Sequence, residues 1–78
     1  MSHDISMGER QIQWGANLRQ ARIAAGLTQT QLAELGGVGQ ASVSRWESGK
    51  EDITDDNKIT VARVLSVDPD QLFPLGGF

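Results

Sequence analysis

The segment TQTQLAELGGVGQASVSRWESG, residues 28–49, decides the fold of this chain. Its first residue, Thr28, favours a helix N-cap, and Gln31 follows at the spacing of a capping box. The Gly36–Gly37 pair predicts the end of this short helix, because glycine adopts the left-handed backbone that a C-cap requires. The apolar face that we expect for this helix consists of Leu32, Ala33 and Leu35.

The second half of the segment predicts another short helix, at about residues 40–48, with two different faces. Its inward face is expected to consist of Val43, Trp46 and Glu47, which share the i, i+3, i+4 spacing. Its outward face is expected to consist of Ala41, Ser44, Arg45 and Ser48. Small residues allow a helix to lie close to another surface, and the arginine can then reach out. Two short helices joined by a glycine turn predict a helix-turn-helix, whose second helix can enter a major groove of DNA; a helical hairpin with a solvated outer face is the alternative.

The flanking sequence predicts three more helices, at 9–25, 55–65 and 69–73. Thr54 favours an N-cap for the fourth helix, and Asp68 followed by Pro69 favours the start of the fifth. The chain is therefore expected to be all-α, with a flexible N-terminal tail (1–8), one helix-turn-helix domain (9–73) and a C-terminal tail (74–78). The core residues expected outside residues 28–49 include Ile12, Trp14, Leu18, Ala21, Ala25, Ile59, Ala62 and Leu65, with Val61 and Val64 beside them.

Two charged residues fall on faces that are expected to be buried. Arg22 shares the inward face of the first helix with Leu18, and Glu47 lies on the inward face of the 40–48 helix. A buried charge is costly unless it is paired. The two residues are best explained as partners in one structural ion pair.

The formal net charge of −3 is unevenly distributed along the chain. Residues 1–50 hold five basic and four acidic side chains, whereas residues 51–78 hold two basic and six acidic ones. The half that contains the predicted helix-turn-helix is therefore nearly neutral. Binding to DNA would depend on few positive charges.

Several other classes of protein lack support in the sequence. There is no cysteine, and the single histidine, His3, lies in the predicted tail, so no metal or cofactor is expected. Neither paired inward carboxylates nor a phosphate-binding loop is present, which argues against an enzyme. No apolar run approaches the length of about 18 residues that a membrane helix needs, and no signal peptide is evident. We expect a soluble, cytoplasmic protein.

The ungapped run GLTQTQLAELGGVGQASVSRWESGK, residues 26–50, resembles the phage-repressor (Cro/CI-type) helix-turn-helix family, also called the XRE family. A looser resemblance extends from Leu18 to Phe73. It implies a five-helix, lambda-repressor-like DNA-binding domain that regulates transcription, with a repressor-like role. It also implies that Arg22 pairs with Glu47. The matching positions are Gly26–Gln29, Leu32–Ala33, Gly37–Val38, Gln40, Ser44–Glu47 and Gly49–Lys50.

The predicted second helix then supplies the candidate DNA contacts. The expected base contacts are Gln40, Ala41, Ser44 and Arg45. Arg45 can bind guanine through O6 and N7, Gln40 can bind adenine, and Ala41 can touch a thymine methyl group. The expected phosphate contacts are Gln29, Ser42, Ser48 and Lys50. The resemblance further implies that Gln29 braces Gln40.

The expected partner is a double-stranded DNA operator with two half-sites about 34 Å apart. Because no separate dimerisation domain is evident, we expect a weak homodimer or a dimer that forms only on DNA. The alternative hypothesis is that the chain is a protein-interaction module on the same fold, such as an antitoxin or an antagonist of another regulator. The acidic 51–56 segment would then dock a basic protein. Glu51 and Asp52 depart from the family pattern, as does Gly39, which stands where relatives often have a serine cap.

Overall fold

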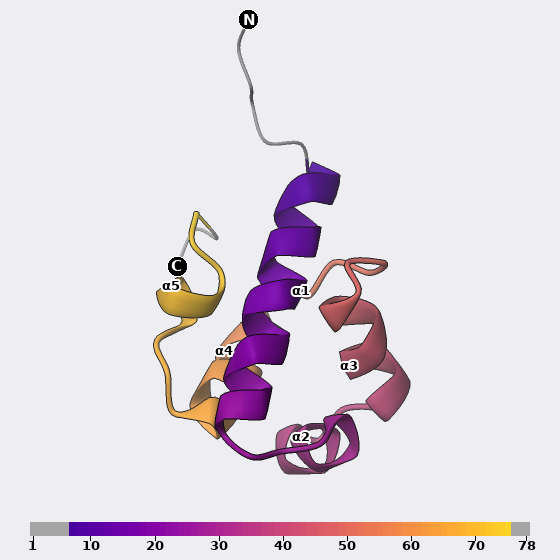
Figure 1. Ribbon diagram of the computed structural model, residues 1–78, viewed down its shortest axis with the longest axis vertical. Helices are drawn as coiled ribbons and strands as arrows, with labels where there is room; N and C mark the ends of the chain where they lie inside the picture. Colours follow the sequence, from indigo (N-terminus) through magenta and orange to yellow (C-terminus); the bar gives the residue numbers. More distant parts are fainter. Residues whose placement is uncertain (1–6, 76–78) are drawn as a thin grey trace, which may run out of the picture.

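The computed structural model describes residues 7–75, which form five helices. They are α1 (Met7–Ala24), α2 (Gln29–Gly36), α3 (Gln40–Glu47), α4 (Asp55–Leu65) and α5 (Pro69–Leu72). Helix α1 runs along the long axis of the molecule and packs against α3 on one side and α5 on the other (Figure 1). Helix α2 lies across one end and contacts both α3 and α4. The predicted all-α, five-helix architecture is confirmed.

The helix boundaries differ slightly from those expected. Helix α1 begins at Met7, so Met7 and Gly8 belong to the helix and not to the predicted tail. The rest of that tail, including His3, lies outside the described residues, as do residues 76–78 of the predicted C-terminal tail. None of the helices within residues 7–75 is long and apolar enough to cross a membrane.

The turn between α2 and α3 is set mainly by α2. The Thr28 hydroxyl accepts a hydrogen bond from the Gln31 backbone N–H at 3.0 Å, and the Gln31 side chain accepts one from the Thr28 N–H at 2.9 Å. Gly37 then caps the helix in the left-handed conformation, with φ of 67°. By contrast, Gly39 precedes α3 without any side-chain cap. The start of α3 therefore depends on its packing and on other hydrogen bonds.

The core draws side chains from all five helices. Its members are Trp14, Leu18, Leu32, Ala33, Val43, Trp46, Ile53, Val61, Ala62, Leu65, Leu72 and Phe73. The exposed residues that had been expected in the core are Ile12, Ala25, Leu35 and Ile59.

Each of these corrections follows from helix geometry. Ile12 precedes the buried Trp14 by two residues, which places it about 200° away around α1. Ala25 lies beyond the end of α1. Leu35 is 63% exposed because α2 turns only its Leu32–Ala33 side to the core.

Helix α4 buries Ala62 and Leu65 as expected, but its buried face is displaced toward Lys58 and Val61 and away from Ile59. Its buried positions are Lys58, Val61, Ala62 and Leu65. This spacing leaves Ile59 41% exposed and makes Val61 fully buried instead of flanking. Lys58 was not expected inside: its Nζ lies 4.1 Å from the centre of the Trp14 ring and 3.4 Å from Oδ1 of Asp55. The aromatic face and the carboxylate both stabilise the buried ammonium group.

Gly15 marks the crossing of α1 and α3. A Cβ atom at this position would lie 2.3 Å from the carbonyl oxygen of Trp46 and 2.7 Å from that of Glu47. Glycine in mid-helix costs about 1 kcal/mol relative to alanine. Here the missing side chain allows the end of α3 to contact α1 directly, and this contact fixes the position of α3.

Candidate nucleic-acid interface

A buried ion pair joins α1 to α3. Arg22 Nε lies 2.6 Å from Oε2 of Glu47, and Arg22 Nη2 lies 3.0 Å from Oε1. The two side chains are only 11% and 4% exposed. Arg22 Nη1 also donates to the carbonyl oxygen of Leu27 at 2.8 Å. One guanidinium therefore holds α1, the link to α2 and the end of α3 together.

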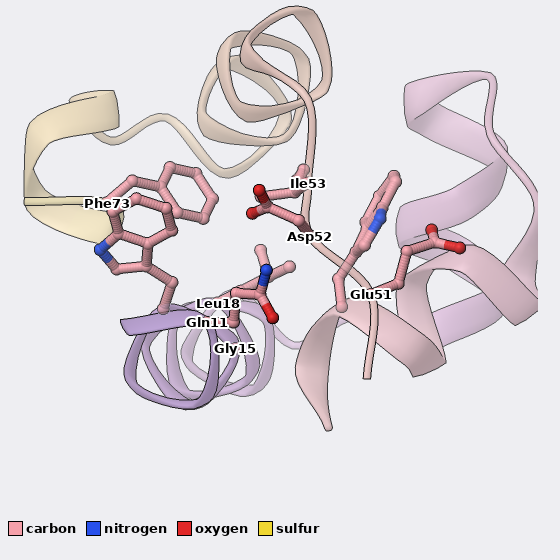
Figure 2. A pocket seen from close by; sticks show the side chains of 9 residues that line it. Gln11, Gly15, Leu18, Glu51, Asp52, Ile53 and Phe73 are labelled. Carbon is pink, nitrogen blue, oxygen red and sulfur yellow. The ribbon is translucent and has the colours of Figure 1, made fainter. Parts of the chain in front are cut away.

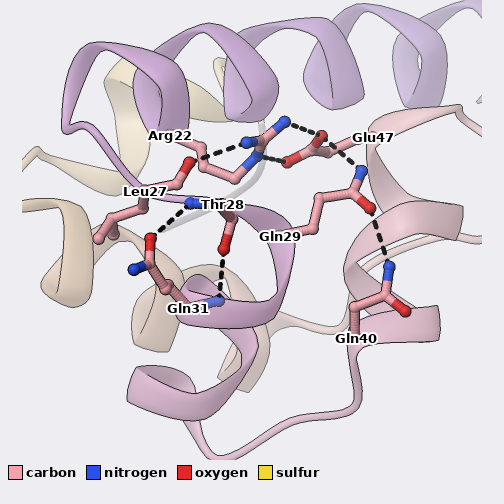
Figure 3. A network of polar contacts seen from close by, with 7 residues as sticks. All are labelled: Arg22, Leu27, Thr28, Gln29, Gln31, Gln40 and Glu47. Atoms are coloured by element: carbon pink, nitrogen blue, oxygen red, sulfur yellow. Dashed lines mark hydrogen bonds and ion pairs between the residues drawn. The ribbon is translucent and has the colours of Figure 1, made fainter.

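Hydrogen bonds continue from this pair to the surface. Gln29 Nε2 donates to Oε1 of Glu47 at 3.1 Å, and Gln40 Nε2 donates to Oε1 of Gln29 at 3.0 Å (Figure 3). Gln29 stands at the first position of α2 and Gln40 at the first position of α3. The series thus braces the start of α3, which lacks a side-chain cap. Since an amide group has two N–H donors and a carbonyl, Gln40 keeps one donor and its oxygen for a ligand.

The two faces of α3 have the character that its sequence predicts. Val43 and Trp46 are buried, whereas Gln40, Ala41, Arg45 and Ser48 are exposed. Ser42 and Ser44 are half-buried, and Lys50 is exposed just beyond the helix. The hydroxyl of Ser48 donates to the carbonyl oxygen of Arg45 at 3.2 Å, so this hydroxyl must turn its hydrogen away from Arg45 to donate to a phosphate. The candidate base contacts therefore lie together on α3, and most are accessible.

A surface hollow of about 210 Å³ lies beside the outward face of α3. Its lining residues are Arg19, Arg22, Gln29, Ser44, Glu47 and Ser48. Arg19 was not among the expected contacts; it is exposed and adds a positive charge near Ser44 and Ser48. The available signal was its position three residues before Arg22, which places both on nearly the same side of α1.

Arg45, the candidate guanine contact, has an unexpected partner. Its Nε donates to Oε1 of Glu51 at 3.1 Å, and the two side chains are 48% and 41% exposed. Glu51 follows α3 in the acidic loop. Within residues 7–75, no group of three or more acidic, histidine or cysteine side chains has the arrangement of a metal site.

Comparisons with known proteins agree with this geometry. A family model described as "Helix-turn-helix" matches residues 18–72. The structure of the restriction-modification controller protein C.AhdI from Aeromonas hydrophila is similar, with 33% identity, a TM-score of 0.78 and coverage of 81% of this chain and 96% of that chain. No curated protein matches the sequence.

Two further structures have the same fold. The clp gene regulator ClgR from Corynebacterium glutamicum has 25% identity and a TM-score of 0.78, over 81% of this chain and 67% of that chain. A hypothetical transcription factor from Neisseria, NHTF, has 24% identity and a TM-score of 0.80, over 94% and 85% of the two chains, and shows the fold alone. The family match, which spans more than half of the chain, and the helix-turn-helix formed by α2 and α3 lead to one conclusion: this protein belongs to the XRE-type helix-turn-helix family.

Proposed function

We propose that this protein is a sequence-specific, repressor-like transcriptional regulator that places α3 in the major groove of DNA. The observation that carries the proposal is the outward face of α3, which is small and polar and is braced from the core through Gln29 and Glu47. Rigid support of this kind holds the side chains that contact bases in a fixed orientation. The matching family supports a role in regulation, as do the similar structures of C.AhdI, a restriction-modification controller protein, and ClgR, a clp gene regulator.

The base contacts that we propose are Gln40, Ala41, Ser44 and Arg45. Gln40 can pair with adenine through its amide oxygen and the N–H that does not bind Gln29. The Nη groups of Arg45 can bind O6 and N7 of guanine, and the methyl group of Ala41 can meet a thymine methyl. Half-buried Ser44 of α3 lines the hollow, where its hydroxyl can reach a base edge or a phosphate.

The phosphate contacts that we propose flank this face. Gln29 lies at the N-terminus of α2, where free N–H groups and the helix dipole favour an anion. The other candidates are Ser42, Ser48, Lys50 and, from the structure, Arg19. Such contacts position a protein on the duplex without selecting a sequence. With few cations available, base contacts would supply an unusually large part of the affinity.

One domain presents one reading helix, so we propose that two copies bind a two-fold operator. The half-sites would then lie about 34 Å apart, one turn of the DNA helix. Association in free solution would be weak, with the dimer forming on DNA. Sedimentation velocity at micromolar concentration, with and without the operator, tests this point.

Selection of bound sequences from random duplex DNA at low salt tests the proposed function. We expect enrichment of one motif with two related half-sites. The matched control is Arg45→Ala, which should enrich the same motif with preference lost at one base pair of each half-site. If the parent enriches no motif, the protein is not a sequence-specific regulator.

The acidic segment supports a second candidate function, as a module that binds another protein. Asp52, Asp55 and Asp56 are all exposed, and they lie in the loop after α3 and in the first turn of α4. A basic partner recovered with the parent in the absence of DNA, and lost with Asp52→Lys/Asp56→Lys, would support this candidate.

A further inference from the structure

The contact between Arg45 and Glu51 joins the reading face of α3 to the acidic loop that follows it. The distance of 3.1 Å involves Nε, the guanidinium nitrogen nearest the chain. Within residues 7–75, the Nη1 and Nη2 groups of Arg45 form no hydrogen bond. The carboxylate therefore holds one edge of the guanidinium and leaves the outer pair of nitrogens available.

This arrangement suits one ligand geometry better than others. Guanine presents two acceptors, O6 and N7, which a guanidinium can meet with two parallel N–H bonds. With Nε already occupied, the outer edge formed by Nη1 and Nη2 can still make both bonds. The nearby negative charge also lowers the attraction of Arg45 for a phosphate, which carries a full negative charge, more than its attraction for the neutral guanine.

The loop that carries Glu51 is anchored to the core. Ile53 is only 6% exposed, and together with Trp46 and Leu18 it lines a small cavity beneath the loop. In Figure 2 the carboxylate of Glu51 points away from that of Asp52, which lies on the other side of the loop. The two neighbouring acids therefore differ in direction, and Glu51 forms the contact with Arg45.

We propose that Glu51 is a positioning residue that orients Arg45 to read guanine and so sets specificity at one base pair. This inference rests on the proposed function. It assigns a role to an acid that would otherwise only repel DNA. The free protein holds the arginine in a reading orientation, so less conformational freedom is lost when DNA binds.

The test compares Glu51→Gln with Asp52→Asn, two variants that each remove one negative charge from adjacent positions. Affinity is measured for the selected duplex, for the same duplex with the Arg45-dependent G·C pair changed to A·T, and for a scrambled duplex. Both variants should bind the scrambled duplex more tightly, and by a similar factor. The Arg45–Glu51 pair and the Asp52 side chain are all exposed, so both variants should melt at the temperature of the parent.

The preference for G·C over A·T separates the two variants. Glu51→Gln should reduce it by about three- to tenfold, a fraction of the discrimination that a bidentate arginine provides. Asp52→Asn should leave it unchanged. In an Arg45→Ala background, Glu51→Gln should reduce the preference no further, because there is no guanidinium left to orient.

The failures are distinguishable. If Glu51→Gln and Asp52→Asn give the same preference, or if Glu51→Gln increases it, Glu51 does not position Arg45 and only this inference is overturned. A parent that binds all three duplexes equally overturns the proposed function, and this inference with it.

Discussion

Helix α3 contributes one residue to each of two arginine–glutamate pairs, and their surroundings differ. Glu47 binds Arg22 through two contacts, of 2.6 and 3.0 Å, between side chains that are 4% and 11% exposed. Arg45 binds Glu51 through a single contact of 3.1 Å, between side chains that are 48% and 41% exposed. The same chemical groups therefore meet once inside the protein and once at its surface.

This difference assigns different roles to the two pairs. Removal of one partner from a buried pair leaves an uncompensated charge in a poorly solvated site. An exposed pair contributes little to stability, because water solvates either charge alone. The inner pair therefore fixes where α3 lies, whereas the outer pair is free to act on a ligand.

Glu47→Ala should have the largest effect on stability. It leaves Arg22 unpaired and removes the acceptor of Gln29, so we expect a loss of about 3–5 kcal/mol in the free energy of unfolding. Urea denaturation followed by circular dichroism measures it. The matched control, Glu51→Ala, should cost less than about 1 kcal/mol. Similar losses in the two variants would remove the distinction between inner and outer pairs.

Gly15→Ala tests the contact that supports the inner pair. Helix propensity alone predicts a gain of about 1 kcal/mol. The structure predicts the opposite sign, because the new Cβ would lie 2.3 Å from the Trp46 carbonyl oxygen, and overpacking of this kind costs about 1–3 kcal/mol. Gly36→Ala is the control, since its Cβ would meet only ordinary contacts at 3.6 and 3.8 Å. A thermal melt of Gly15→Ala above that of the parent would show that α1 and α3 do not approach so closely.

Arg45→Ala should affect DNA reading and leave folding nearly unchanged. We expect a loss of about 1–3 kcal/mol in binding the selected duplex, with preference relaxed at one base pair. Fluorescence anisotropy on duplexes that vary at each position measures both effects. An equal loss of affinity for every sequence would identify Arg45 as a phosphate contact.

Asp52→Lys should have a smaller effect, on the electrostatic part of binding. The exposed side chain lies in the loop five residues after the end of α3, so a lysine there could reach a phosphate strand. We expect the slope of log affinity against log salt to steepen by up to about 1, while the ratio of selected to scrambled binding stays nearly constant. Asp70→Lys, on α5 at the other side of α1, is the control and should not alter the slope. An unchanged slope for Asp52→Lys would place this side of the loop away from DNA.

Much of the fold could be predicted from short-range patterns. The capping box of Thr28 and Gln31, the glycine stop after α2 and the inward positions of Val43 and Trp46 depend on neighbours within one or two helical turns. The partnership of Arg22 and Glu47 followed from two charges on apolar faces, and from the family resemblance.

The remaining features depend on how helices pack, which local spacing does not determine. Helix propensity alone makes Gly15 unfavourable, and the need for glycine there arises from a carbonyl group 31 residues later in the chain. Lys58 was not among the residues expected in the core, because its place beside the rings of Trp14 and Phe73 depends on how the helices pack. The contact of Arg45 with Glu51 requires the loop to turn back beside α3, and no periodicity of the sequence encodes that turn.

The central claim, that DNA binds to the outward face of α3, is tested most directly by NMR chemical-shift changes during titration of ¹⁵N-labelled protein with the selected duplex. We predict that the largest changes occur at Gln29, in residues 40–50 and at the Nε–H of Arg45, with little change in α5. A scrambled duplex should give smaller changes in the same region at the same concentration. Changes concentrated in residues 52–56 and α5, with α3 unaffected, would contradict the claim.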